Sequence, residues 1–600
     1  MIIGIDLGTT NSLGAAFIDG ESVLIPNEYG DFLTPSVVSL SDDNCIIVGK
    51  AAKERLVSNP QKTAQLFKRT MGTEKTYKLG NKEYSSEELS AFILQSIKKD
   101  AEAFLKEEVT EAIISVPAYF DDARREATKR AGIIAGLKVE RIINEPSAAA
   151  LACRMEKRKE VVINTLTTML FDSADNADTE VYDDDQIYMI FDFGGGTLDV
   201  SLVECFENVI SITAVSGNNH LGGSDIDKQI AREFCSIHNI NYDQLNNHEY
   251  SMILKQAEKS KIALTDCSEY IMRVVINGEE KQLELTQEKL IKICATVLKQ
   301  LLIPISKVMM DSQTTIEMIN EIVLIGGSSK MPIIAKYLES RTGKKPITIG
   351  SPDTMVAQGL GIYAGMKERK EEIKDMVMTD ICPFTLGIST YNESNQSKDY
   401  MSPIIERNTV LPCTKSNIYT PVHLEQKCIE IRIYQGEAMY VDENTFLGNI
   451  TVKLPKKTGK LEEVEVKMTY DINGILEVEA TILSTGEKCQ SYIIKQGGLS
   501  EKEIAERKER LEQIKKEESE NAKGKLVLER ANSLYQMING PLRDQLSYYV
   551  HMYNNTIESG TPLSIKRSTN FMEQYLDKLE KSLDQYGLLE ESIEIDEDDF

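Results

Sequence analysis

The residues from Met189 to Asp199 combine a carboxylate with a glycine-rich turn, a pattern that can bind phosphate. An apolar run ends at Asp192, three glycines follow at 194–196, and Thr197 precedes a second apolar run. Glycine leaves backbone N–H groups open to close approach by an anion. Because a carboxylate repels phosphate unless a cation lies between them, Asp192 predicts Mg²⁺ held through water. Taken alone, the pattern fits a flexible hairpin loop equally well.

Two further turns have a similar composition. The chain opens on an apolar run at 2–5, followed by Asp6, Gly8, Thr9 and Thr10, and then by a second apolar run. Two copies of strand, Asp, Gly, hydroxyl residue and strand predict duplicated halves that face one nucleotide. A third turn at 326–329 follows an apolar run and offers glycine N–H groups where a strand ends.

Length and charge narrow the class of protein. The chain has 600 residues, which predicts two to four domains rather than one core. Its 94 acidic and 68 basic side chains give a net charge of −26, which argues against nucleic-acid and anionic-membrane partners. Ten cysteines without a C-x-x-C pair indicate structural thiols in a reducing compartment. With no long apolar run and no signal-like start, we expect a cytoplasmic protein.

The turns need strands and helices to position them, and the first part of the chain has the alternating pattern of an α/β region, predicted at 1–374. Predicted strands lie at 112–116 and 139–143. An acidic, polar stretch interrupts the pattern at 156–186 and predicts a surface insertion. Helices are predicted at 121–135, 145–152, 224–238, 250–263, 287–310 and 354–370.

The pattern changes after a short apolar patch. Residues 375–381 predict an interdomain linker, and 382–498 alternate at period two between turn signals, which predicts an antiparallel β-sandwich. A capping box at Ser500 and Glu503 begins a helical region predicted at 499–589. The acidic tail at 590–600 is predicted to be disordered.

The order and spacing of these motifs resemble the DnaK-type chaperones of the seventy-kilodalton heat-shock family over nearly the whole chain. Residues 5–12 (IDLGTTNS), 116–120 (VPAYF) and 144–150 (NEPSAAA) carry the resemblance, with the turns at Asp192 and Gly326. Similarity to the HscC-like branch rests on 379–383 (TDICP), 402–409 (SPIIERNT) and 470–474 (YDING).

The resemblance implies an α/β actin-like ATPase of two lobes with duplicated ribonuclease H-like halves, then an antiparallel β-sandwich and an α-helical lid. ATP and ADP, Mg²⁺ and a candidate K⁺ are the implied cofactors. Extended apolar peptide segments are the implied ligands, with a J-domain co-chaperone and a nucleotide-exchange factor as partners. Nothing in the resemblance implies nucleic acid or a membrane.

The resemblance also assigns roles around ATP. Phosphoryl transfer to water needs chiefly charge neutralisation and an aligned nucleophile. Lys68 matches the lysine that positions the attacking water, and Glu145 the carboxylate that orders it, whereas Lys68 without the family is an ordinary surface lysine. The resemblance implies that Asp6, Asp192 and Asp199 hold the metal, largely through water. It also places Asp192, Thr197 and Asp199 among the catalytic residues. Implied nucleotide contacts are Asp6, Gly8, Thr9, Thr10, Asn11, Gly194, Gly195, Gly196, Thr197, Gly222 and Gly223.

A second set matches the family's contacts to base and ribose. Many relatives have arginine at the position of Lys330, and a planar guanidinium stacks on adenine better than an ammonium does. We therefore expect a weaker adenine contact. The set is Glu258, Lys261, Gly326, Gly327, Ser328, Lys330 and Asp353.

Coupling and peptide binding are likewise implied by the match. Pro117 and Arg125 would relay the nucleotide state to the linker, although a strand terminator and a surface charge explain them equally well. Arg141 and Asp380 match contacts to the J-domain, with plain surface charge as the alternative. The linker carries Met376, Val377, Met378 and Thr379 where relatives are leucine-rich, which predicts weaker coupling. The implied groove residues are Leu386, Ile388, Ile429, Ile431 and Ile433, with Tyr391 and Val422 at the arch.

Two other classes remain open from the sequence. An actin-like small-molecule kinase shares the two Asp-Gly-Thr turns, but the β-region and the helical region argue against it. An actin-like filament former is the third reading, against which the long extension after the ATPase lobes argues.

Overall fold

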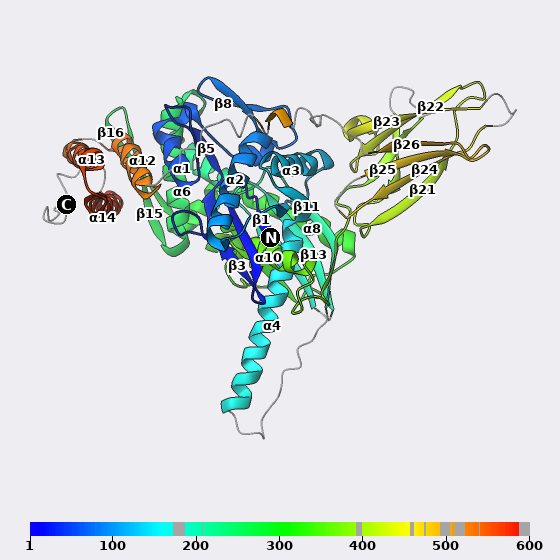
Figure 1. The fold of residues 1–600 in the computed structure, drawn as a ribbon, viewed down its shortest axis with the longest axis horizontal. Coiled ribbons are helices and arrows are strands. Elements are labelled where there is room, and N and C mark those ends of the chain that lie inside the picture. Colours follow the sequence, from blue (N-terminus) through cyan, green and yellow to red (C-terminus); the bar gives the residue numbers. More distant parts are fainter. Residues whose placement is uncertain are drawn as a thin grey trace.

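The computed structural model describes residues 1–171, 186–206, 208–391, 399–455, 461–472, 476–492, 505–507, 509, 522–538 and 540–586. A large α/β region is followed by a β-sandwich and by a C-terminal helical unit (Figure 1). The predicted capping box at Ser500 and Glu503 and the predicted disordered tail at 590–600 lie outside the described residues.

The first sheet is built around β1 (Ile2–Asp6). This strand is parallel to β10 (Glu111–Val116) and antiparallel to β2 (Asn11–Ile18). The apolar strands predicted at 112–116 and 139–143 lie within β10 and β11, and the continuous burial of 112–116 suits a sheet covered on both faces. The sheet order is β11-β10-β1-β2-β3, with β4 beside β2; the other bounds are β3 (Glu21–Ile25), β4 (Thr34–Pro35) and β11 (Lys138–Asn144).

The second sheet repeats this construction. Its strand β12 (Gln186–Phe193) is parallel to β17 (Glu321–Ile325) and antiparallel to β13 (Leu198–Phe206). In both sheets an Asp therefore lies at or next to the end of the strand that has one parallel and one antiparallel neighbour, as the duplicated turns predict. The order is β17-β12-β13-β14-β18, where β14 is Val209–Asn218 and β18 is Val377–Thr379.

Helices and small strands surround the two sheets and complete two lobes. Lobe I is the first sheet with α1 (Lys50–Ser58), α2 (Ser86–Leu105), α3 (Asp122–Ile134), β5 (Val37–Leu40), β6 (Ile46–Val48), β7 (Thr63–Gln65), η2 (Phe67–Thr70), β8 (Thr76–Leu79) and β9 (Lys82–Ser85). Lobe II is the second sheet with α5 (Gly223–Ile237), α6 (Asn247–Asp266), β15 (Glu269–Ile276), β16 (Glu279–Thr286), α7 (Gln287–Ile293), α8 (Ala295–Ser312) and α9 (Pro332–Thr342). Between the sheets, α4 (Glu145–Phe171) packs against α10 (Met355–Lys367).

Two helices differ from the sequence prediction. The helix predicted at 287–310 is broken at Cys294 into α7 and α8, which are bent by 72°. The bend lets the apolar side chains of both helices join one buried core. The helix predicted at 145–152 continues to Phe171 and projects from the body (Figure 1), so part of the predicted insertion at 156–186 is helical. Residues 172–185 of that insertion lie outside the described residues.

The β-region forms two four-stranded antiparallel sheets that enclose one apolar core. The period-two alternation predicted this, because each strand turns one face inward and the other to solvent. The sheets are β20-β19-β22-β23 and β21-β24-β25-β26, with bounds β19 (Leu386–Thr390), β20 (Tyr400–Ile405), β21 (Cys413–Tyr419), β22 (Cys428–Gln435), β23 (Thr445–Lys453), β24 (Val464–Tyr470), β25 (Leu476–Ile482) and β26 (Lys488–Tyr492).

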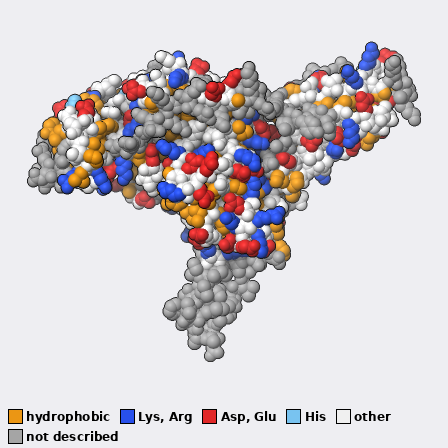
Figure 2. All heavy atoms as spheres, viewed as in Figure 1, with side chains coloured by type: hydrophobic (Ala, Val, Ile, Leu, Met, Phe, Trp, Pro, Cys, Tyr) orange, Lys and Arg blue, Asp and Glu red, His pale blue; other side chains and the backbone are white. Residues whose placement is uncertain are grey.

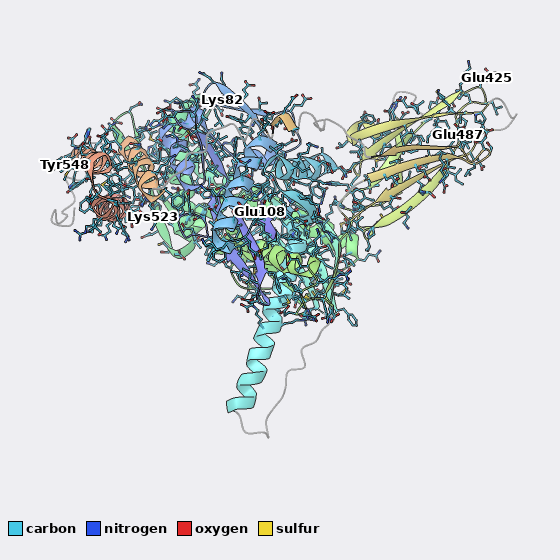
Figure 3. The ribbon with its side chains drawn as sticks, in the orientation of Figure 1. Lys82, Glu108, Glu425, Glu487, Lys523 and Tyr548 are labelled. Atoms are coloured by element: carbon cyan, nitrogen blue, oxygen red, sulfur yellow. The ribbon has the colours of Figure 1, made fainter. Side chains whose placement is uncertain are left out.

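The C-terminal unit consists of α12 (Ala522–Met537), α13 (Pro541–Ser559) and α14 (Pro562–Tyr586), which share a core. It packs on lobes I and II, whereas the resemblance implied a lid for the sandwich. Figure 3 places Lys523 and Tyr548 of this unit at one end of the molecule and Glu425 and Glu487 of the sandwich at the other.

The visible surface mixes acidic and basic side chains over the α/β region (Figure 2). No described helix is by itself both long and apolar enough to cross a bilayer; only the bent pair α7 and α8, taken together, meets that criterion.

Candidate nucleotide site

Three carboxylates gather where the two sheets end. Asp192 is the last residue but one of β12, and Asp199 stands directly opposite it on β13, so both side chains lie on one face of the hairpin. Asp6 is the corresponding last residue of β1. Ser115 Oγ donates to Asp6 Oδ1 over 2.7 Å, and the Tyr119 backbone N–H donates to Asp199 Oδ1 over 3.2 Å.

Burial makes the negative charge of these carboxylates costly. Burial first, and the neighbouring charge of Glu145 second, raise the pKa of Asp6 and of Asp199 to about 7. The pKa of Asp192 is raised well above its ordinary value, first by burial and then by Glu145, Asp199 and Asp6. Three buried carboxylic groups of this kind fit a cation, because a cation restores the charged form.

A Mg²⁺ ion would be held here largely through water. Among the described residues, no three His, Cys, Asp or Glu side chains come close enough to bind a metal directly. Mg²⁺ keeps several of its waters in protein sites, so the carboxylates at the strand ends suit water-mediated contact.

The two phosphate turns interlock. A Cβ atom on Gly195 would lie 2.2 Å from Thr10 Cγ2, and one on Gly196 would lie 2.2 Å from Thr9 Cγ2. Side chains at these two positions would force the turns apart, so glycine is required by the close approach. Thr197 and Thr9 are both buried at this contact.

Other predicted phosphate residues support the same clamp. A Cβ on Gly222 would lie 2.5 Å from the Gly196 nitrogen, and the Gly223 N–H donates to the Gly194 carbonyl over 3.0 Å. Gly8 is held in a tight turn by Ser12, whose Oγ accepts from the Gly8 N–H. Asn11 begins β2 directly after this turn.

Lys68 is buried beside the carboxylates. Its ammonium donates to Glu145 Oε1 over 2.6 Å, and the two side chains are only 3% and 9% exposed. Lys68 sits in η2, while Glu145 is the first residue of α4. The reading of Lys68 as an ordinary surface lysine is therefore wrong for this structure.

The third turn lies beside the Asp192 turn within lobe II, because it follows β17, the parallel neighbour of β12. Gly326 has φ +79°, a conformation that favours glycine, and a Cβ there would lie 2.5 Å from Asp192 Oδ1. A Cβ on Gly327 would lie 2.6 Å from Asp353 Oδ1, and Lys330 forms an ion pair with Asp353. Ser328 is buried against Gly223. The predicted base contacts Gly326, Gly327, Ser328, Lys330 and Asp353 thus lie together.

The two remaining predicted base contacts lie on α6. Lys261 pairs with Asp227 over 2.8 Å and donates to the Gly223 carbonyl over 3.3 Å. Glu258 accepts from Lys53 of lobe I over 2.9 Å, so this ion pair crosses from one lobe to the other.

Sequence reasoning missed several residues of the site. Arg69 donates from Nε to the Gly196 carbonyl over 2.9 Å and pairs with Asp225 over 2.6 Å. Asp225 in turn accepts from the Gly222 N–H. For Arg69, the one available signal in the sequence was that it directly follows Lys68. Lys53 and Asp227 belong to no motif.

A cavity of about 760 Å³ opens next to the clamp. Thr9, Thr10, Lys53 and Glu258 are among the residues that line it. It therefore joins the Asp6 turn to the predicted base contacts on α6, which is the size and place that a nucleotide needs.

A chain of hydrogen bonds leads from Asp199 to the linker. The Tyr119 N–H donates to Asp199, and the preceding Ala118 carbonyl accepts from Arg125 Nη2 over 3.3 Å. Arg125 Nη2 donates to Asn144 Oδ1 over 2.5 Å, and Asn144 Nδ2 donates to both carboxylate oxygens of Asp380 over 2.8 Å. Pro117 is buried at the start of this segment.

The linker is a strand of the second sheet. Val377, Met378 and Thr379 pair in parallel with β14, and Thr379 Oγ1 donates to Ser211 Oγ over 3.1 Å. Met376 is buried at the edge of the core between the lobes. Asp380 is also buried and bonded within the chain, so a partner protein reaches it only after rearrangement.

The predicted groove residues divide by burial. Four of them, Leu386, Ile388, Ile431 and Ile433, lie in the core of the sandwich, and Ile429 packs against it. Tyr391 and Val422 are exposed at 45% and 44%. Arg141 lies apart, with its guanidinium 4.7 Å from the centre of the Tyr363 ring.

Comparison with known proteins agrees with this architecture. A family model described as Hsp70 protein matches residues 2–588. The chain is 36% identical over 561 residues to the chaperone protein DnaK of Thermotoga neapolitana, covering 90% of this chain and 88% of that protein. It is 37% identical over 546 residues to the DnaK proteins of Thermotoga petrophila and Thermotoga maritima, covering 88% of this chain and 86% of each.

The match extends through the β-sandwich and the helical unit, which an actin-like kinase alone would not explain. From the fold, the interlocked phosphate turns and these matches, the chain belongs to the Hsp70 family of ATP-dependent chaperones, which hydrolyse ATP.

Proposed function

We propose that this chain hydrolyses ATP at the Asp6 and Asp192 turns and transmits the nucleotide state to its β-sandwich through Asp199, Arg125 and Asp380. The observation that carries the proposal is the buried Lys68–Glu145 pair beside three carboxylates whose charge needs a cation. Bound Mg²⁺ would neutralise phosphate charge there.

The protein groups then perform three tasks. The backbone N–H groups of Gly194, Gly195 and Gly196 bind phosphate oxygens, and the interlocked turns fix their position. Lys68 orients the attacking water, while Glu145 holds the ammonium in place and accepts a hydrogen bond from that water. Thr197 lies buried at the turn, where its hydroxyl is available to the terminal phosphate.

The coupling part of the proposal rests on contacts between the ATPase region and the sandwich. The Tyr119 ring lies 4.5 Å from the ring of Phe384, so one residue touches Asp199 through its backbone and the sandwich through its side chain. Tyr470 donates to Asp122 over 2.6 Å, and Arg407 pairs with Asp311. We infer that a shift at Asp199 moves this interface and thereby the peptide site.

We place the peptide site at the end of the sandwich marked by Tyr391 and Val422, which are exposed and apolar. The sheets below this site are then shaped by the buried residues Leu386, Ile388, Ile431 and Ile433. Ile429, which packs against that core, lies between these residues and the site. A J-domain co-chaperone, an exchange factor and K⁺ belong to the proposal as expected for the family, as does assignment to the HscC-like branch.

Single-turnover ATP hydrolysis tests the catalytic part. We expect Lys68→Ala and Thr197→Ala each to slow hydrolysis by about 10²-fold or more, because each removes a group at the reacting phosphate. Lys98→Ala, on the surface of α2, is the matched control and should hydrolyse ATP at the wild-type rate. Wild-type rates in both site variants would refute the site assignment.

Peptide binding tests the coupling part. An array of apolar peptides should bind the protein in its ADP form, and the bound protein should dissociate when ATP is added. Equal retention in ATP and ADP would contradict the proposed coupling while leaving the hydrolysis site intact.

A further inference from the structure

The C-terminal unit α12–α14 lies against both ATPase lobes, at the side where the nucleotide cavity opens. Helix α12 contacts α1 of lobe I and α6 of lobe II, and α14 contacts β15 of lobe II. Figure 1 shows the three helices stacked on this end of the ATPase region, on the side away from the sandwich. The unit therefore bridges the lobes instead of covering the peptide site.

A buried ion pair anchors the unit to lobe I. Arg55 Nη1 lies 2.8 Å from Glu529 Oε1, and the two side chains are 7% and 11% exposed. Arg55 is held from the other side, since its Nε donates to Ser39 Oγ and its Nη2 to the Leu40 carbonyl. Leu526 packs against the small apolar cluster around Ala51. Removal of Glu529 would leave the Arg55 charge buried without its partner, which is costly.

Several contacts anchor the unit to lobe II. Lys255 of α6 donates to Ser533 Oγ over 2.8 Å and also to Glu54 Oε2 of lobe I over 2.7 Å. One ammonium thus joins both lobes and the helical unit. Asp584 of α14 accepts from Lys259 over 2.6 Å and from the Tyr270 hydroxyl over 3.0 Å. Met537 is buried as a member of the lobe II core.

The same unit forms one wall of the nucleotide cavity. The cavity runs from Thr9 and Thr10 of the phosphate clamp past Glu258 to the side chains of α12 and α14. On that wall, Arg530 is fixed by Asp577 and Glu580 of α14. Residues of this wall include Leu526, Leu534, Met537, Leu583 and Asp584, together with Arg530 and Glu580.

We propose that α12–α14 is a retention cap for nucleotide, a role that rests on the proposed nucleotide site. A nucleotide held between two lobes leaves when the lobes separate. Because the cap is anchored on both lobes, separation must first break the Arg55–Glu529 contact or the contacts of Lys255 and Asp584. Docking of the cap therefore slows nucleotide release without changing the phosphate clamp, and undocking accelerates it.

Release of a fluorescent N-methylanthraniloyl-ADP from the full-length chain, chased with excess unlabelled ADP, tests this role. We expect Glu529→Gln to release the nucleotide about tenfold faster or more, because it neutralises the lobe I anchor. Asp584→Asn, at a half-exposed contact, should give a smaller acceleration. Single-turnover hydrolysis in Glu529→Gln should stay within about twofold of wild type, since Glu529 does not line the cavity and the clamp is untouched.

Glu87→Gln is the matched control. Its ion pair with Arg130 is also short, at 2.7 Å, and equally buried, with both side chains 12% exposed, but it lies wholly within lobe I. If Glu87→Gln accelerated nucleotide release as much as Glu529→Gln, a general loss of rigidity would explain the effect and the proposal would be overturned. Unchanged release in Glu529→Gln and in Asp584→Asn would also overturn it. If Glu529→Gln fails to fold, Asp584→Asn alone decides, because loss of a half-exposed contact is tolerated. Failure of the wild-type chain to bind ADP would refute the nucleotide site itself.

Discussion

Lys68 Nζ lies 2.6 Å from Glu145 Oε1 in a pocket closed to solvent, with one partner from η2 and the other from the start of α4. The ammonium also lies 5.7 Å from the centre of the Phe120 ring. This pair brings a cation and a carboxylate to the edge of the three strand-end carboxylates. The site therefore depends on an ion pair whose partners are far apart in the sequence.

The pair should show strong energetic coupling. Glu145→Gln and Lys68→Met each leave a buried charge without its partner, which costs about 3 kcal/mol or more, whereas the double variant removes both charges. We expect each single variant to lower the melting temperature and the double variant to lower it by less than the sum of the two. Thermal unfolding of the four proteins measures this. Strict additivity would show that the contact does not couple them.

The interlocked turns predict a sharp difference between adjacent glycines. Gly196→Ala would place a Cβ 2.2 Å from Thr9 Cγ2 and should weaken ADP binding by about tenfold or more, because the turns must separate. Gly194→Ala is the matched control, since its Cβ would meet Thr197 only at an ordinary 3.6 Å and its N–H is retained. Calorimetric titration with ADP compares them. Equal affinities would contradict the close approach of the two turns.

The linker should respond to changes at Thr379. Its hydroxyl bonds to Ser211, but its side chain buries less apolar surface than leucine does. Thr379→Leu should therefore strengthen linker docking and raise the stimulation of ATP turnover by an apolar peptide, whereas Thr379→Val isolates the loss of the hydroxyl at nearly constant shape. Steady-state ATP turnover with and without peptide gives the ratio. Wild-type stimulation as strong as in Thr379→Leu would contradict the expected weak coupling.

Docking of the sandwich should depend on pH through Asp122. Burial raises the pKa of this carboxyl to about 6 in the docked arrangement, where Tyr470 donates to it. Once the sandwich leaves, the pKa of the exposed carboxyl falls toward its ordinary value near 3.8. The docked state then binds the extra proton, so docking strengthens as the pH falls through about 6 and weakens as the pH rises through it.

Hydrogen exchange at the amides of β18, corrected for intrinsic rates, reports this docking between about pH 5 and pH 7. Asp122→Asn keeps the shape of the side chain but does not titrate in this range. We expect protection of β18 to vary with pH in the wild type and to be nearly constant in the variant. A variant with the wild-type pH dependence would exclude Asp122 as the responsive group.

Local pattern accounts for the elements that carry the site. The apolar runs before Asp6 and Asp192 form β1 and β12, and the duplicated turns lie at corresponding ends of two similar sheets. These features are predictable because an apolar run followed by Asp, Gly and a hydroxyl residue indicates a strand and a turn from a few neighbouring residues alone. The bend at Cys294 escaped prediction, since both α7 and α8 continue one helical periodicity and only the shape of the core breaks them.

Contacts between distant segments account for the rest. Arg69, Lys53 and Asp227 carry no motif, and their part in the site appears only when the lobes are assembled. The sandwich strands were predictable, but alternation could not tell a sealed core from a groove, and the structure buries Leu386 and Ile433 completely.

The sequence by itself determined the family, the order of the regions and the residues of the phosphate turns, because these depend on short motifs and on local periodicity. Only the tertiary structure decided that Lys68 is buried against Glu145, that the linker is a strand of the second sheet, and that α12–α14 lies over both lobes. The physical reason is that each of these depends on which surfaces become buried together, and burial is a property of the assembled chain. Arg55 and Glu529 look like ordinary surface charges until folding removes both from water and makes each the partner the other requires.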